Sequence, residues 1–154
     1  MKTWKLSSII LASSMALSLT AEARGGGSGV LFDVNLYYGS TKTDMKQTTP
    51  AETKTESTTA LYDIKLGYLA GTGIYLGGIY TSRSNSVLNA SGESGTAYGG
   101  SLGYFGSSGF FVMGHYIASA TLGHYTEGKG MQVDFGYKAG VGGDWLVGGE
   151  ITYR

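Results

Sequence analysis

Few side chains in this chain could carry acid–base or nucleophilic chemistry near neutral pH, and the search begins with its two histidines, His115 and His124. Ser119 follows His115 by four residues, about 13 Å along an extended strand, which is too far for the imidazole to accept its proton. Two histidines alone do not make a metal site, and without cysteine the chain has no thiolate ligand, disulfide or lipoprotein anchor. We therefore predict no catalytic, cofactor-binding or metal-binding residues.

The charged residues that fall within the predicted strands form a second group of interest. They share one face of those strands, and acids and bases occur there in equal number. Because buried charges need partners of opposite sign, we interpret the group as a self-neutralising structural network, with ion conduction as the alternative. One register would place Asp134 opposite Glu150, with Lys138 or another base between them. The predicted network contains Asp33, Asp63, Lys65, Arg83, His115, Asp134, Lys138 and Glu150, with Arg154 as a further inward base.

The elements that position these residues are predicted to be β-strands. Residues 30–38, VLFDVNLYY, alternate between two different sets of side chains, which is typical of a strand with two distinct faces. The same alternation recurs along the chain and gives seven visible strands. Four of them run in one direction and three in the other: 28–39, 73–83, 109–119 and 144–154 rise, and 60–70, 97–106 and 130–139 fall.

A Gly-Tyr pair ends each falling strand, in the sequences LGYLAG, LGYFG and FGYKAG. Each pair precedes a tight glycine turn, whereas the other connections, 40–59, 84–95 and 120–130, are long and polar. Eight threonines and Pro50 in 40–59 indicate a solvated loop. Short turns on one rim and long loops on the other are typical of an outer-membrane barrel.

The two strand faces differ in size and charge. One face carries most of the strand aromatics and no charge, and the other carries glycines, Ser101 and nearly all the strand charges. A barrel of about eight strands has an interior just wide enough for ordinary side chains, so we predict that the aromatic face points outward into lipid. Aromatic rings then form two interfacial girdles. One girdle contains Tyr68, Tyr104, Tyr137 and Trp145, and the other contains Tyr38, Tyr62, Tyr80, Tyr98, Tyr116 and Tyr153.

The N-terminal residues are predicted to be an export signal. Lys2 and Lys5 precede an interrupted apolar run, and Ala21-Glu22-Ala23 has small residues at the two positions that a signal peptidase reads. The run is too short for a membrane-spanning helix, which needs about 20 apolar residues. We predict a signal peptide over 1–23, cleaved near Ala23, and a barrel domain over 24–154.

These features together resemble the small outer-membrane barrels of Gram-negative bacteria, the OmpX-like and OmpA-like class. The resemblance covers residues 28–154 as an architecture. It implies an all-β, antiparallel, up-and-down transmembrane β-barrel of eight strands with a blocked lumen, located in the outer membrane. The implied partners are outer-membrane lipid, lipopolysaccharide and the barrel-assembly machinery. Equal numbers of acidic and basic residues give no indication of a nucleic-acid partner.

Only seven of the eight expected strands are visible, and the absent one is a falling strand. A truncated reading frame that ends at Arg154 is the favoured explanation, because an open sheet edge in lipid leaves backbone groups unpaired. Parallel closure by the first and last strands, or a strand donated by another chain, are the alternatives.

Some barrels of this size modify lipid A, and the deacylases among them carry His-x-Ser on one strand face. Here Ile117 stands two residues after His115, so the pattern fails. We predict an integral outer-membrane barrel that has a structural or surface-exposed role and no catalysis. The alternatives are a binding or adhesion module that acts through its long loops, and a narrow pore.

Overall fold

The fold is all-β and is described from a computed structural model. The structure describes residues 11–18, 28–45, 53–87, 90–142 and 144–154, and no helix among them is long and apolar enough to cross a membrane. Eight strands follow one another: β1 (Leu11–Ser18), β2 (Gly29–Met45), β3 (Thr53–Leu69), β4 (Ile74–Val87), β5 (Ala90–Phe105), β6 (Phe110–Leu122), β7 (Tyr125–Gly142) and β8 (Trp145–Tyr153).

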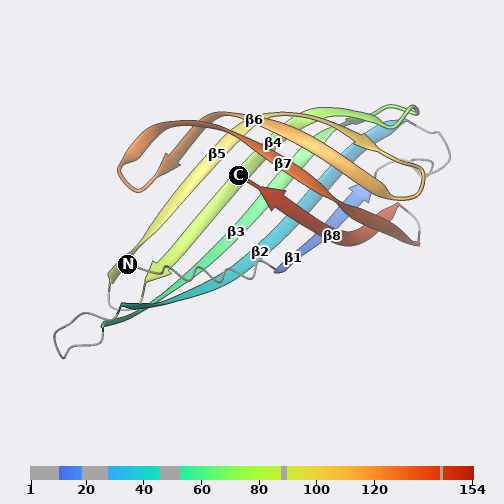
Figure 1. The fold of residues 1–154 in the computed structure, drawn as a ribbon. Helices are drawn as coiled ribbons and strands as arrows, with labels where there is room; N and C mark the ends of the chain where they lie inside the picture. Colours follow the sequence, from blue (N-terminus) through green and yellow to red (C-terminus); the bar gives the residue numbers. More distant parts are fainter. Residues whose placement is uncertain (1–10, 19–27, 46–52, 88–89, 143) are drawn as a thin grey trace, which may run out of the picture.

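The strands form an up-and-down barrel (Figure 1). Each strand pairs antiparallel with the next in sequence, and β1 pairs with β8 to close the sheet. The seven strands predicted from the alternating pattern correspond to β2–β8, so the all-β antiparallel fold class is confirmed.

The closing strand is the falling strand that the seven-strand pattern lacks. It comes from Leu11–Ser18 and not from a segment after Arg154 or from a parallel pairing of β2 with β8. Its centre is Met15, which pairs with Val34 on one side and Val147 on the other. Leu11–Ser18 lies within the predicted signal peptide. Cleavage of residues 1–23 stays a prediction, and one molecule cannot both lose these residues and keep β1.

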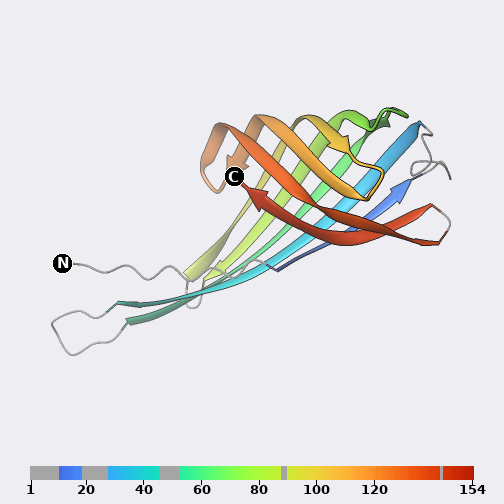
Figure 2. The same cartoon turned by 45° about the vertical axis from the view of Figure 1, so that its right-hand side comes forward.

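The strands extend further than the sequence pattern predicted. Most of 40–59 is strand, since β2 and β3 remain paired as far as Met45 and Thr53. Residues 84–95 and 120–130 are likewise largely strand, so the expectation of three long loops at this rim is wrong within the described residues. Threonine is β-branched and favours extended backbone, which outweighs its polarity. Figure 2 shows the β2–β3 hairpin projecting beyond β6 and β7.

The predicted division into an inner and an outer face holds along the strands. Along β2, Asp33 and Asn35 are fully buried, whereas Leu36 and Tyr38 are 58% and 65% exposed. The same alternation continues on β6, where Phe111, Met113 and His115 are buried between exposed neighbours. The interior therefore holds buried charged and polar residues together with a smaller apolar group, and the outside carries exposed apolar and aromatic residues.

Inward-facing glycines make room for two large aromatic residues inside the barrel. Gly67 pairs with Gly77, and the ring of Tyr75 lies over them, so a Cβ on Gly67 would come within 2.7 Å of the Tyr75 ring. Gly136 stands in the same relation to Phe111, with a distance of 3.0 Å. These contacts explain why a glycine precedes the tyrosine in the repeated Gly-Tyr pairs. The tyrosine of each pair lies on the outer surface, and the glycine before it leaves space for side chains in the interior.

We expect Gly67→Ala to lower the free energy of unfolding by about 1–3 kcal/mol, because the added methyl group crowds the backbone of Leu76 and Gly77 as well as the ring of Tyr75. Gly100 is the matched control, since a Cβ there would meet nothing within 4 Å. Gly100→Ala should be neutral or slightly stabilising. Urea unfolding of the refolded protein in detergent measures both changes, and equal losses would show that the space beside Tyr75 is not the cause.

Candidate functional site

The interior of the barrel is filled in layers, and the layer nearest the short turns is apolar. Its buried members are Leu31, Leu69, Tyr75, Phe111 and Met113, with Phe105 and Leu146 packed against them. The rings of Phe105 and Phe111 are stacked with centroids 5.2 Å apart, and Tyr75 meets Phe105 edge-on at 6.1 Å. This apolar plug closes the short-turn end of the lumen.

A buried lysine occupies the centre of the polar layer above the plug. Lys65 on β3 is 1% exposed, and its Nζ lies 2.5 Å from Asp134 and 2.8 Å from Glu150. Asp134 is on β7 and Glu150 on β8, so the contacts cross the lumen between strands that are not neighbours. Tyr37 from β2 donates a hydrogen bond to the same Glu150 carboxylate. Lys65 thus ties opposite walls of the barrel together.

His115 belongs to a second chain of hydrogen bonds that ends on Asp134. Its Nε2 lies 2.8 Å from Asp134 Oδ2, and its Nδ1 lies 2.6 Å from the Ser101 hydroxyl. Ser101 and His115 are register partners on β5 and β6. Serine, histidine and aspartate therefore stand in the order of a hydrolytic triad. All three side chains are buried, however, with Ser101 only 3% exposed, and Asp134 is also engaged by Lys65.

Asp63 anchors the side of the network nearest the open rim. Thr81 donates to one of its oxygens at 2.6 Å, and the Arg154 guanidinium contacts the other at 2.6 Å. Gln132 donates to both Asp63 and Asp134, and its own oxygen accepts from Arg154 Nε at 2.7 Å. These hydrogen bonds join the four side chains into one layer, which forms a floor beneath the outer part of the lumen.

A separate ion pair lies below Lys65. The Lys138 ammonium contacts Asp33, and it stands 4.9 Å from the centroid of the Phe111 ring. The pair joins β7 to β2 across the lumen and rests directly on the apolar plug.

Two predicted details of the charge network are wrong. Asp134 is not opposite Glu150, because its register partner is Thr152, and the base between the two acids is Lys65. Arg83 does not join the network, and no described residue forms an ion pair with it. It lies higher in the lumen, whereas Arg154 takes part through Asp63. The other predicted members, Asp33, Asp63, Lys65, His115, Asp134, Lys138 and Glu150, are all buried in the interior.

The carboxylates of Asp63, Asp134 and Glu150 lie close enough to suggest a cation site, with oxygens within 4.8 Å of one another. Their charges are already matched, since Lys65 contacts Asp134 and Glu150, and Arg154 contacts Asp63. The trio is therefore better described as part of the ion-pair network than as a metal centre.

Neutral members of the network were missed at the sequence level. Ser101 was assigned only as a small inward residue, and Gln132, Tyr37 and Thr81 were not assigned a role. Ser101 pairs with His115 because of the register between β5 and β6. Alternation shows which residues face inward, but it does not show which residues of neighbouring strands lie opposite each other. The hydrogen bond from Tyr37 to Glu150 passes between strands separated by β1, so no neighbouring-strand argument predicts it.

The predicted girdle residues lie on the outer surface. At the short-turn rim Tyr68, Tyr104, Tyr137 and Trp145 are about half exposed. At the opposite rim exposure is 40% or more for each member: Tyr38, Tyr62, Tyr80, Tyr98, Tyr116 and Tyr153. The two sets flank a band of exposed aliphatic residues that includes Leu76, Leu102 and Val112.

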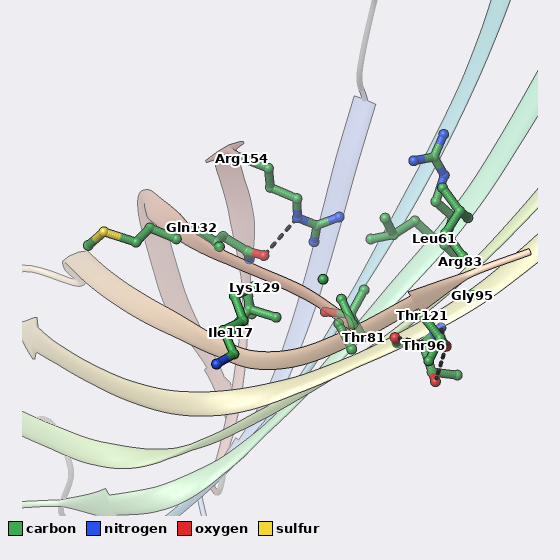
Figure 3. A pocket seen from close by; sticks show the side chains of 16 residues that line it. Leu61, Thr81, Arg83, Gly95, Thr96, Ile117, Thr121, Lys129, Gln132 and Arg154 are labelled. Carbon is green, nitrogen blue, oxygen red and sulfur yellow. Dashed lines mark hydrogen bonds between the residues drawn. The ribbon is translucent and has the colours of Figure 1, made fainter. Parts of the chain in front are cut away.

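A cavity of about 310 Å³ lies above the charge network, towards the rim of long strands. Arg83, Lys129 and Arg154 line it, together with aliphatic residues that include Leu61, Ile117 and Leu122. Figure 3 shows Arg154 and Gln132, joined by their hydrogen bond, on one side and Leu61 and Arg83 on the other. We call this cavity the vestibule.

Comparison of the chain with models of protein families, with curated proteins and with solved structures gives no match.

Proposed function

We propose that this protein is an integral outer-membrane β-barrel with a structural or surface-exposed role and no catalysis. The supporting observation is the inverted arrangement of its side chains. Fully buried charges fill the interior, and large apolar side chains stand exposed around the outside. A protein in water seldom exposes a contiguous apolar patch of more than a few hundred Å². A barrel in lipid requires such a band, with aromatic residues at its edges.

The resemblance to OmpX-like and OmpA-like barrels supports the same compartment. Export by a cleaved signal peptide over 1–23, assembly by the barrel-assembly machinery and contact with lipopolysaccharide are parts of this proposal. In a chain that keeps residues 11–18, closure of the sheet by β1 also suits lipid, where an unpaired strand edge costs several kcal/mol for each backbone group.

The buried side chains that fill the lumen support a role without catalysis or ion conduction. Ser101, the hydroxyl of the triad-like chain, is only 3% exposed and lines neither the vestibule nor the second cavity, which lies beside Thr126 and Glu127. The ion pairs of Lys65 and Lys138 and the apolar plug lie one below another along the axis. A hydrated ion would have to break these contacts to pass.

The proposal is tested by locating the protein in the cell envelope. We expect it to sediment with outer membranes and to migrate differently on gels before and after boiling. Recovery in the soluble periplasmic fraction without detergent would contradict the membrane assignment.

We expect Val112→Arg to destabilise the barrel in lipid by about 2–4 kcal/mol, because it places a charge near the middle of the apolar band. Ala118→Arg lies on the same strand beyond the Tyr116 girdle, where a charge is expected to cost only about 0–1 kcal/mol. Both side chains are exposed, so the two variants differ mainly in depth. Unfolding from lipid vesicles measures the difference, and equal losses would contradict the proposed membrane position.

Surface binding is the second candidate, and the projecting β2–β3 hairpin favours it. Pairing from Ser40–Thr58 to Met45–Thr53 raises this part of the sheet above the rest of the rim (Figure 2). Deleting residues 41–57 should leave the barrel folded but abolish adhesion to any surface that the intact protein binds.

A further inference from the structure

In the described part of the chain, the wall of the vestibule carries positive charge and contains no acidic residue to neutralise it. Among the described residues that line it, Arg83, Lys129 and Arg154 are basic and none is acidic. Arg154 is already paired with Asp63 below, and Lys129 is exposed at the rim. Arg83 is different. No ion pair to it occurs among the described side chains, and its Nε is buried without a hydrogen-bond partner. Such a guanidinium can donate hydrogen bonds to the oxyanion of a ligand from outside the chain.

Most of the rest of the wall is apolar or small, and its other polar members are Thr81, Thr96, Thr121 and Gln132. Leu61, Ile117 and Leu122 contribute aliphatic surface, and Gly95, Ala97 and Ala120 leave space between them. Gly95 is the register partner of both Arg83 and Leu122, so the cation and the aliphatic wall are adjacent across three strands. A ligand that fits must therefore carry its negative group and its apolar part close together.

The floor of the vestibule makes it a closed-ended site. Thr81 and Gln132 line its base, and both are held by hydrogen bonds to Asp63. Beneath them lie Lys65 and its two acids. A molecule that enters from the long-strand rim meets a fixed polar layer and has no path onward, which favours binding over passage. The volume, about 310 Å³, is at the small end of ligand pockets.

We propose that the vestibule binds a small amphiphilic anion, an oxyanion group joined to a short aliphatic or aromatic body. The Arg83 guanidinium holds the oxyanion, and the wall of Leu61, Ile117 and Leu122 covers the apolar body. The inference depends on the proposed outer-membrane location in one respect: that location places the opening of the vestibule at the cell surface. The site itself is a property of the lumen.

The test uses the full chain refolded in dodecyl maltoside and shown to be heat-modifiable, so that a failed barrel is recognised before ligand is added. Hexanoate, hexyl phosphate, 1-hexanol, hexylammonium and acetate are titrated at constant ionic strength, and amide shifts of Gly95 and Ile117 are followed. We expect saturable shifts with hexanoate or hexyl phosphate, and binding at least about tenfold weaker for 1-hexanol and hexylammonium. The tighter of the two anions identifies the head group. Equal binding of hexanoate and 1-hexanol, or of hexanoate and acetate, would overturn the proposal.

Variants separate the cation from the wall. Arg83→Gln should weaken hexanoate binding by about tenfold, and Arg83→Lys should retain most of it. Lys42→Gln removes one positive charge from a backbone position about 17 Å further along the sheet, and it should bind like the unmodified protein. Ala97→Leu fills the vestibule while keeping Arg83, and it should abolish the hexanoate shifts. If Arg83→Gln binds hexanoate normally, or Ala97→Leu does, the site is not the one described.

Discussion

Replacing Lys65 by methionine is expected to lower the free energy of unfolding by about 3–5 kcal/mol. Methionine has a similar length, so the loss comes from charge and hydrogen bonding more than from volume. The Lys65 ammonium contacts Asp134 and both oxygens of Glu150, and all three side chains are buried. Without it, two carboxylates remain in the lumen with only His115, Gln132, Tyr37 and Thr152 as partners. Urea unfolding in detergent micelles measures the change.

A matched lysine and a second substitution identify the cause. Lys129 is exposed at the rim, so Lys129→Met should change stability by no more than about 1 kcal/mol. Adding Glu150→Gln to Lys65→Met removes one of the two uncompensated charges and should recover part of the loss, because His115 still faces Asp134. If the double variant is less stable than Lys65→Met alone, the uncompensated charge is not the source of the destabilisation.

The strands and their two faces could be predicted because both depend on local patterns. In VLFDVNLYY, alternation alone separates Asp33 and Asn35 from Leu36 and Tyr38, and the structure buries the first pair and exposes the second. The tyrosines of the repeated Gly-Tyr pairs were likewise predicted to point outward, and Tyr68, Tyr104 and Tyr137 are about half exposed. Neither inference needs to know which strands lie opposite each other.

The partners in the charge network could not be predicted in the same way. Lys65 reaches β7 and β8 across the lumen, and such contacts depend on the tilt and stagger of the whole sheet. Parity allowed Lys138 to stand between Asp134 and Glu150. In the structure Lys138 lies lower, where it meets Asp33 above the Phe111 ring. Alternation also placed Arg83 correctly on the inner face of its strand. In the structure, however, Arg83 lines the vestibule, above the ion-pair network to which its charge had assigned it.

Two segments of the chain carry two signals at once. The threonines of 40–59 are polar, which suggested a loop, and β-branched, which favours the strands observed. Residues 11–18, LASSMALS, are apolar enough for the core of a signal peptide. They also place Ala or Ser at every even position, as small-residue alternation in a strand requires. Composition and position in the chain favour a signal peptide, which stays a prediction, and in the structure the same residues form β1.

The largest effect is expected at the closure of the barrel, where these two interpretations meet. β1 pairs with eight residues of β2 and with four of β8. If residues 1–23 are removed, those two strands lose their partner, and in lipid each unpaired backbone group costs several kcal/mol. Both strands rise, so they could meet each other only in parallel. We therefore expect residues 24–154 alone to refold into dimers or aggregates and not into a stable monomer.

Amide exchange at Val34 and Asn35 on β2, and at Leu146 and Val147 on β8, reports closure directly, because all four residues pair with β1. Successive residues of an antiparallel strand direct their N–H groups to alternate sides, so one amide of each couple faces β1. In the full chain the two amides that face β1 should exchange slowly in micelles. Met15→Pro keeps the length of the chain but disrupts ladder hydrogen bonding at the centre of β1, and it should speed exchange at both of these amides. Extending residues 24–154 after Arg154 by about ten alternating residues that end in an aromatic should supply another falling strand and restore a protected monomer. A stable monomer of residues 24–154 with both amides already protected would contradict this account. It would show that β2 and β8 close the barrel without β1, and that the segment 1–23 can leave as a signal peptide with no loss to the fold.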